Sequence, residues 1–307
     1  MIPKKFLVYP VIIFSMIFWS LSYIWYKQVY QYFEPITTIF FRLVISTLFL
    51  VIITLLTGKL QKVQKGDLKI FILASVFQPL MYFFGESYGM KYLSSTVGSV
   101  LIGTIPIFTA IFGYLYFREK LSRINIGGII ISFAGVLLVI LENDLSFRIS
   151  VKGLFFMILA IFSAIAYSVM VIRLSEKYNA YTIVTVQNFI GIFLFLPLFL
   201  IFDLDNFLAV PLNISVLEPL IKLAVFASSM AFVFFTYGIR NLGITKANMF
   251  SNIIPVFTAV FAWLILGDLI TQRQMAGILI VIAGLFLSQI KPSFKIRKRH
   301  LLWRRNY

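Results

Sequence analysis

The 307-residue chain contains no cysteine and a single histidine, His300, near its C-terminal end. The lack of cysteine excludes disulfides, thiol catalysis and Cys-ligated zinc or iron. One histidine in a basic tail also excludes a histidine metal cluster and a histidine-based catalytic triad. We therefore expect no cofactor, no bound metal and no catalytic residue.

Charged residues are also scarce, at 12% of the chain against 61% hydrophobic residues. Soluble domains have about a quarter charged and about half apolar residues, so a soluble globular domain is excluded. The 27 basic residues outnumber the 11 acidic ones. They stand in short clusters between apolar runs of about twenty residues, the length that spans a bilayer. The composition indicates an integral membrane protein.

Ten apolar stretches are long enough to cross a membrane as helices. Strands of a membrane barrel would be about ten residues long with alternating apolar side chains, whereas these runs are longer and do not alternate. The predicted fold class is all-α integral membrane. The ten transmembrane helices are expected at residues 7–26, 36–57, 68–89, 94–117, 123–141, 151–172, 180–202, 216–239, 245–267 and 272–290.

Basic residues are unevenly distributed between the two sides of the predicted membrane. With the N-terminus in the cytoplasm, the inner segments carry 20 Lys and Arg and the outer segments six. Cytoplasmic loops carry the excess of positive charge, so a multi-pass protein with both termini in the cytoplasm is predicted. The basic tail at residues 291–307 is expected to contact anionic lipid. Nucleic-acid binding by this tail is the less favoured alternative.

The chain matches itself without gaps at an offset of 149 residues. Residues 105–110 (IPIFTA) align with residues 254–259 (IPVFTA), and Gly135 aligns with Gly284. Each copy contains five predicted helices, so the second copy must insert in the opposite sense to the first. Such inverted repeats are typical of transporters, and a duplicated scaffold without transport is the alternative. The expected division is a first repeat at residues 1–145, an inverted second repeat at 146–290 and the tail.

The repeats carry motifs of a known superfamily. These motifs are the Pro-Ile-Phe-Thr-Ala and Pro-Val-Phe-Thr-Ala segments, Glu119 and Asp268 in the turns that follow them, and the Ala-Gly pairs of the fifth and tenth helices. They resemble the drug/metabolite transporter superfamily, specifically its ten-helix EamA type. The resemblance implies a bacterial inner-membrane carrier of small metabolites, often an exporter, with both termini inside. Related four-helix multidrug transporters carry an essential glutamate in their first helix. This chain has none there, so proton coupling is not carried over.

Arg42 and Glu86 are the only charged side chains well inside the predicted helices. Each costs about 2.5 to 3.5 kcal/mol at a helix centre when unpaired. From the expected outer helix ends, Arg42 lies about 9 Å deep and Glu86 about 6 Å deep, at 1.5 Å per residue. We expect the two to interact at the outer side of a cavity, as a fixed ion pair or as a gate or contact for a substrate carboxylate. The second half offers neutral Gln187 and Asn188 instead.

Pro106 and Pro255 lie within the fourth and ninth helices, where each removes a backbone N–H and frees a carbonyl. Carriers commonly place substrates at such discontinuous helices. The expected binding or gating residues are these two prolines, Arg42, Glu86, Trp19, Tyr23, Gln78, Tyr82, Ser99, Thr104, Gln187, Asn188, Ser228, Ser229, Asn248, Ser251 and Asn252. Helix packing alone is the alternative for the small residues and prolines, and interface anchoring for Trp19 and Tyr23.

The function predicted from these features is secondary transport by alternating access. The family resemblance and the mixture of amides, hydroxyls and aromatics favour an amino acid or a similar small organic metabolite as the substrate, exported across the bacterial inner membrane. Multidrug efflux is an alternative. An intramembrane enzyme or receptor is the rival class, but no nucleophile with a base, pair of acids or metal-ligand set converges within the helices. A channel lacks an evident filter loop.

Overall fold

The computed structural model describes residues 8–117, 122–140, 150–243, 247–248 and 250–288, and it contains only helices and connecting turns over these ranges. The basic tail, Glu119 and the expected boundary between the repeats at residue 145 lie outside the described residues. Eight segments are long and apolar enough to span a membrane, and residues 250–266 and 272–288 form two shorter apolar segments. The ten-helix prediction is confirmed in number and order.

The first half contains five helical segments, two of them interrupted. Helices α1 and α2 are continuous, whereas a π-helical stretch separates α3 from α4 and a break at Thr104 separates α5 from α6. The bounds are α1 Val8–Val29, α2 Pro35–Thr57, η1 Lys65–Asp67, α3 Leu68–Ser75, η2 Val76–Met81, α4 Tyr82–Tyr92, α5 Ser95–Gly103, α6 Ile105–Phe117 and α7 Arg123–Ile140.

The second half repeats this pattern with more irregular turns. A π-helical stretch again interrupts the eighth segment, and further irregular turns extend the seventh and ninth. The bounds are α8 Val151–Lys177, α9 Ala180–Leu198, η3 Phe199–Asp203, α10 Leu204–Leu208, α11 Ile214–Lys222, η4 Leu223–Met230, α12 Ala231–Leu242, η5 Phe250–Ile253, α14 Ile254–Phe261, η6 Ala262–Leu266 and α15 Gln272–Ser288.

The expected proline breaks are present. Pro106 is the second residue of α6, just after the break at Thr104, and Pro255 is the second residue of α14, just after the 3₁₀ turn η5. Proline is tolerated at these positions because the first N–H groups of a helix have no intrahelical partner. Each proline therefore begins a new helix.

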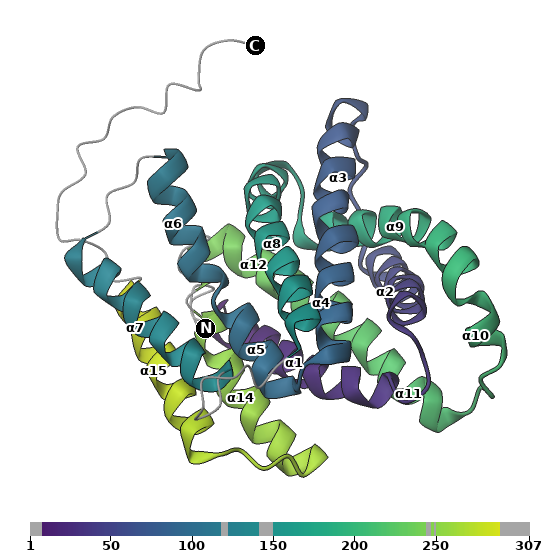
Figure 1. Cartoon of the computed structure of the whole chain (residues 1–307). Coiled ribbons are helices and arrows are strands. Elements are labelled where there is room, and N and C mark those ends of the chain that lie inside the picture. The colour runs from purple at the N-terminus through teal and green to yellow at the C-terminus, as the bar shows by residue number, and fades with distance from the viewer. Residues whose placement is uncertain (1–7, 118–121, 141–149, 244–246, 249, 289–307) are drawn as a thin grey trace, which may run out of the picture.

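Helices α7 and α15 pack against each other, and Figure 1 shows them side by side. A Cβ atom on Gly128 would lie 2.7 Å from the Gly284 carbonyl oxygen, and one on Gly135 would lie 2.8 Å from that of Gly277. As the residue number rises in one helix it falls in the other, so the two helices are antiparallel. The offset of 149 relates Gly128 to Gly277 and Gly135 to Gly284. Gly128 therefore contacts the counterpart of Gly135, and Gly135 contacts the counterpart of Gly128.

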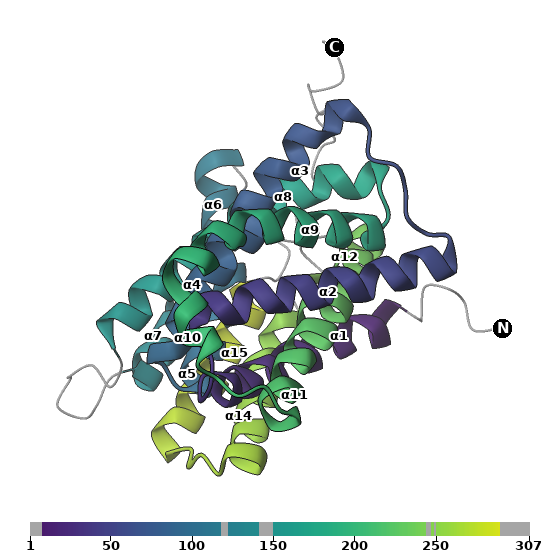
Figure 2. The ribbon, with the colours of Figure 1, turned by 90° about the vertical axis from the view of Figure 1, so that its right-hand side faces the viewer.

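Other helices of the first half also pack against helices of the second. Helix α4 of the first half packs against α8 of the second, and α12 of the second half packs against α1 of the first. Helix α2 likewise contacts α9, and α5 contacts α14. Figure 2 shows α2 and α9 running alongside each other. Exchanging each helix with its counterpart 149 residues away converts the α4–α8 contact into the α12–α1 contact and leaves the α2–α9 contact unchanged. Each of these four contacts joins a helix of one half to a helix of the other.

The two ends of α2 identify opposite ends of the bundle. At its start, the Asp203 carboxylate accepts hydrogen bonds from the Thr37 amide (2.9 Å) and hydroxyl (3.0 Å). Beyond its last turn, the Asn179 side chain donates to the Lys59 carbonyl (2.7 Å). Residues 58–67 and Asp203 consequently lie at opposite ends. We name them the predicted cytoplasmic end and the predicted outer end, respectively.

Candidate functional site

Arg42 lies at the centre of a buried polar network, with only 2% of its surface exposed. Its Nε donates to Ser228 Oγ (2.7 Å) and its Nη1 donates to the Tyr26 hydroxyl. The guanidinium carbon lies 4.1 Å from the centre of the Phe83 ring, close enough for a cation–π interaction. Arg42 thus joins α1, α2 and α4 of the first half to η4 of the second.

Glu86 is the negative group of this network. Its Oε2 lies 3.8 Å from Arg42 Nη1 and accepts a hydrogen bond from Tyr26 (2.8 Å), while Oε1 accepts one from Tyr82 (2.9 Å). Arg42 lies seven residues after the start of α2, and Glu86 six before the end of α4, about 10 Å and about 9 Å deep at 1.5 Å per residue. The expected pairing is present. Glu86 lies deeper than expected because α4 continues to Tyr92 instead of ending near residue 89.

A second set of polar contacts continues from Ser228 toward α9. The Asn188 amide donates to Ser46 Oγ (2.7 Å) and to the Ser228 carbonyl (3.2 Å), and Ser46 Oγ lies 2.6 Å from Ser229 Oγ. Ser228 and Ser229 lie in the π-helical stretch η4. A π turn displaces backbone groups from the regular hydrogen-bonding pattern, and such turns are frequent at functional sites. Both halves therefore contribute donors and acceptors to one cluster.

Gln187 and Gln78 border a small closed cavity beside this cluster. Gln187 Oε1 accepts from the Tyr167 hydroxyl (3.1 Å), and its Nε2 donates to the Gln78 carbonyl (3.4 Å). That carbonyl is available because Gln78 has an extended backbone (φ −147°, ψ 115°) inside the third segment. The cavity has a volume of about 10 Å³, which is room for about one water molecule, and Phe83 and Phe232 also line it.

The halves are chemically unequal at equivalent positions. The offset of 149 relates Arg42 to Gly191 and Ser228 to Pro79. Arg42 is hydrogen-bonded to Ser228, whereas a Cβ atom on Gly191 would lie 2.4 Å from Pro79 Cγ. The Arg42–Ser228 contact is thus polar, whereas the equivalent Gly191–Pro79 contact is only steric. Only one side of the pseudo-symmetric core carries the charged pair.

Comparison with known proteins identifies the family. The model of the EamA-like transporter family matches residues 7–141 and again residues 151–289. The chain belongs to the EamA-like transporter family. Two uncharacterized transporters of Archaeoglobus fulgidus are 26% and 27% identical to it, each over 90% of this chain and 95% and 96% of their own lengths. The uncharacterized transporter YetK of Bacillus subtilis is 24% identical over 81% of this chain and 76% of its own.

A solved structure supports the fold of this EamA-like transporter. A crystal structure with 12% sequence identity superposes with a TM-score of 0.69 and covers 92% of this chain and 98% of its own. Family membership, the transporter names of the relatives and the apolar helices together make the chain a multi-pass membrane transporter.

The structure brings about half of the predicted site residues of this EamA-like transporter together. Those in the Arg42 network, the Asn188 cluster or the lining of the small cavity are Arg42, Gln78, Tyr82, Glu86, Gln187, Asn188, Ser228 and Ser229. Sequence reasoning left Tyr26, Ser46 and Tyr167 out of the site, although all three form hydrogen bonds within it. The position of Tyr26 one helical turn after Tyr23 was the available signal.

The other predicted residues lie elsewhere in the transporter. Thr104, Ser99 and Ser251 donate their hydroxyls to backbone carbonyls three residues earlier in their own segments. Gly103 approaches Pro255, which places the fourth and ninth segments in close contact at their breaks. Pro106 and Asn252 are buried and Asn248 is half-buried along these segments.

The two aromatic candidates of α1 lie in different surroundings. Trp19 packs edge-on against Phe232 (5.1 Å between ring centres) and Phe235 (4.9 Å) of α12. Tyr23 is 2% exposed, and its carbonyl accepts a hydrogen bond from Ser95 (2.9 Å). Trp19 therefore packs against helix α12, and Tyr23 lies one turn from Tyr26. Among the described residues, no group of three or more His, Cys, Asp or Glu could hold a metal ion.

Proposed function

We propose that this transporter exports a small organic metabolite, such as an amino acid, across the bacterial inner membrane by alternating access. Its two five-helix halves insert in opposite senses, with both termini in the cytoplasm. The observation that carries the proposal is the buried polar network around Arg42, Glu86 and Asn188, to which both halves contribute. Charged groups inside a membrane are costly unless paired, and they commonly mark a transport pathway.

The packing of the helices supports the opposite insertion of the halves. Antiparallel contact between α7 and α15 through repeat-related glycines is what a twofold axis in the membrane plane produces. Two similar halves around one site can exchange conformations, so that the site opens to either side in turn. The 10 Å³ cavity beside Asn188 corresponds to a conformation closed around the site, and moving the halves apart enlarges it.

The residues of the network support an amino acid over a phosphorylated substrate. Arg42 is the one basic side chain among the described residues of the network, and Glu86 lies beside it. A sugar phosphate or nucleotide sugar would need several cationic groups around its phosphates. Amide, hydroxyl and single-charge groups fit the amine, carboxylate and neutral parts of a small zwitterionic molecule. Multidrug efflux is the second candidate, favoured by the aromatic side chains Phe83 and Phe232.

Counterflow in proteoliposomes tests the proposal. Liposomes preloaded with unlabelled amino acids are expected to take up the same labelled amino acid with saturable kinetics. Asn188→Leu removes two hydrogen bonds at the site, each worth about 1–3 kcal/mol when its loss leaves a buried group unpaired. Uptake should therefore fall by about tenfold or more. Everted membrane vesicles then test the direction, because an exporter accumulates substrate in them.

Asn241→Leu is the matched control. Asn241 is exposed, and within the described part of the chain its side chain is bonded only to its own helix, at the Tyr237 carbonyl (2.7 Å). Uptake by this variant should therefore equal that of the wild type. Non-saturating flux would instead indicate a channel, and chemical alteration of the amino acid an enzyme. Saturable transport of lipophilic cations but of no amino acid would favour multidrug efflux. Equal uptake by the Asn188 and Asn241 variants would contradict a site at this network.

A further inference from the structure

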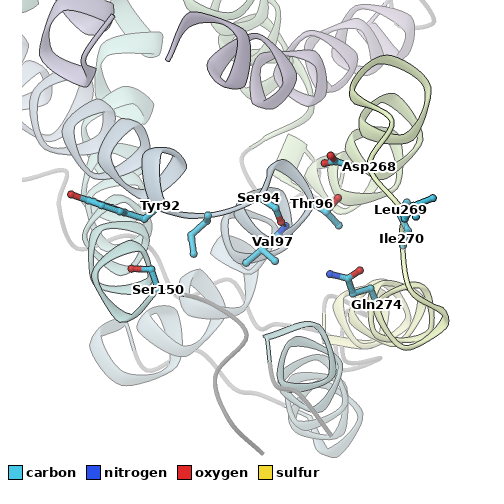
Figure 3. Close-up of a pocket in the computed structure, with 10 residues that line it drawn as sticks. Tyr92, Ser94, Thr96, Val97, Ser150, Asp268, Leu269, Ile270 and Gln274 are labelled. Atoms are coloured by element: carbon cyan, nitrogen blue, oxygen red, sulfur yellow. The ribbon is translucent and has the colours of Figure 1, made fainter. Parts of the chain in front are cut away.

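A larger cavity opens at the predicted outer end, away from the Arg42 network. Its volume is about 290 Å³, close to the lower limit of about 300 Å³ for small-molecule pockets. Its walls come from the turn between α4 and α5 in the first half and from the turn between η6 and α15 in the second. Figure 3 shows side chains of both turns facing the same space. A cavity between the halves is positioned to meet a substrate before or after transport.

Asp268 provides negative charge on one wall of this cavity. Its carboxylate forms no ion pair within 4.0 Å among the residues that the structure describes, and it is half-buried. The ammonium group of Lys27 interacts with it electrostatically, but it donates its hydrogen bond to the Met90 carbonyl (2.7 Å). The carboxylate is therefore available to a cationic group of a ligand.

Hydrogen-bond donors also line the cavity. Thr96 is 4% exposed and lines the cavity, and its hydroxyl has no hydrogen-bond partner among the described residues. Gln274 is 9% exposed and uses its Oε1 to accept from the Thr271 amide (3.1 Å) and hydroxyl (3.3 Å). The amide nitrogen of Gln274 has no hydrogen-bond partner among the residues that the structure describes, so it can donate into the cavity.

The start of α5 adds to these donors. Ser94 caps this nine-residue helix by accepting from the Val97 amide (3.3 Å), and the first intrahelical bond runs from Gly98 to the Ser94 carbonyl (3.0 Å). The amides of Ser95 and Thr96 precede that bond, so they contribute the positive end of the helix dipole. The start of α5 therefore favours negative charge, whereas the Asp268 carboxylate favours positive charge.

We propose that this cavity is a second, peripheral binding site for a zwitterionic amino acid. The ammonium group pairs with Asp268, and the carboxylate accepts hydrogen bonds from Thr96 and Gln274. An anion without an amine would be repelled by Asp268, and an amine without a carboxylate would leave the buried Thr96 hydroxyl and Gln274 amide without acceptors. A molecule with both charges satisfies Asp268 and these donors at once. The inference rests on the proposed transport function, since it identifies the chemical class that the carrier meets at its outer end.

Equilibrium binding to the purified full-length protein tests this site. The probes are the twenty proteinogenic amino acids, followed by the decarboxylated amine and the deaminated acid that correspond to the tightest binder. We expect both analogues to bind about tenfold or more weakly than the amino acid, because each lacks one charge-assisted contact. Asp268→Asn should weaken amino-acid binding by about tenfold or more. Thr96→Val keeps the shape of the side chain and should weaken binding of the amino acid but not of the amine.

Glu218→Gln is the matched control, because Glu218 is an acid at the same end whose side chain is 55% exposed and pairs with Lys222. The Glu218→Gln variant should bind the amino acid as tightly as the wild type. Thermal unfolding establishes that all variants fold. If no amino acid binds in a manner that depends on Asp268 or Thr96, or if the amine binds as tightly as the amino acid, the proposed site is wrong. Counterflow distinguishes failure of this site from failure of the transport proposal. Saturable exchange together with unchanged amino-acid binding in Asp268→Asn and Thr96→Val rejects the site alone. Absence of exchange for every amino acid rejects the transport proposal.

Discussion

Replacing Arg42 by methionine is expected to destabilise the protein by about 3–5 kcal/mol, because it removes one partner of a buried ion pair. Glu86 would then lose its nearby cation and remain 6% exposed among aromatic side chains, with Tyr26 and Tyr82 as its remaining donors. Ser228 would also lose the Nε donor of Arg42. Thermal unfolding in detergent and the yield of folded protein measure the effect.

The double variant Arg42→Met/Glu86→Gln distinguishes pairing from two independent contributions. Neutralising both partners removes the uncompensated charge, so most of the lost stability should return. Lys91→Met is the control, since Lys91 pairs with Glu34 at the surface, where their side chains are 36% and 43% exposed. Such exposed pairs contribute about 1 kcal/mol or less. Additive losses in the double variant would show that Arg42 and Glu86 do not act as a pair.

Gly128→Ala should separate α7 from α15 and destabilise the bundle by about 1–3 kcal/mol, the typical cost of overpacking a core. The added Cβ atom would lie 2.3 Å from the Ser288 amide nitrogen and 2.7 Å from the Gly284 carbonyl oxygen. Both are backbone atoms, which cannot turn aside as a flexible side chain can. The midpoint of thermal unfolding measures the change.

Gly127→Ala is the matched control for the same helix. A Cβ atom on Gly127 would contact nothing within 4 Å, so this change removes a helix-interior glycine and should leave stability equal or raise it by up to about 1 kcal/mol. Equal destabilisation by the two alanine variants would contradict close packing at Gly128. A stable Gly128→Ala variant would likewise remove the main structural support for the pseudo-twofold arrangement.

Helix number, the proline breaks and the Arg42–Glu86 pair could be predicted from sequence, because each depends on a local or pairwise rule. Apolar runs of bilayer length predict helices whatever their packing. Pro106 and Pro255 cannot donate a backbone hydrogen bond. Two isolated opposite charges at similar depth in a membrane are expected to pair, because each is costly when unpaired. The glycines of the repeat identified the internal symmetry, whereas their contact across the two halves became visible only in the structure.

Other features depend on where turns and backbone groups lie in three dimensions. The π turn at η4 directs Ser228 toward Arg42 and Ser229 toward Ser46, and no residue pattern specifies a π turn. Thr104 and Ser99 were expected in the site, but a hydroxyl on a helix can equally bond to the carbonyl of the preceding turn. The outer cavity combines residues more than 170 positions apart, from Thr96 to Gln274. Sequence spacing carries no information about that proximity.

Labelling of single cysteines in whole cells tests the central claim, that two halves of opposite sense enclose one polar site. The chain has no native cysteine, so Lys62→Cys and Leu212→Cys each introduce a unique target in an exposed segment. These positions lie in the loops between the second and third and between the seventh and eighth helical segments. A membrane-impermeant maleimide should label Leu212→Cys in intact cells but Lys62→Cys only after permeabilisation. Labelling of both variants from the same side of the membrane would contradict the inverted halves and the carrier mechanism that depends on them.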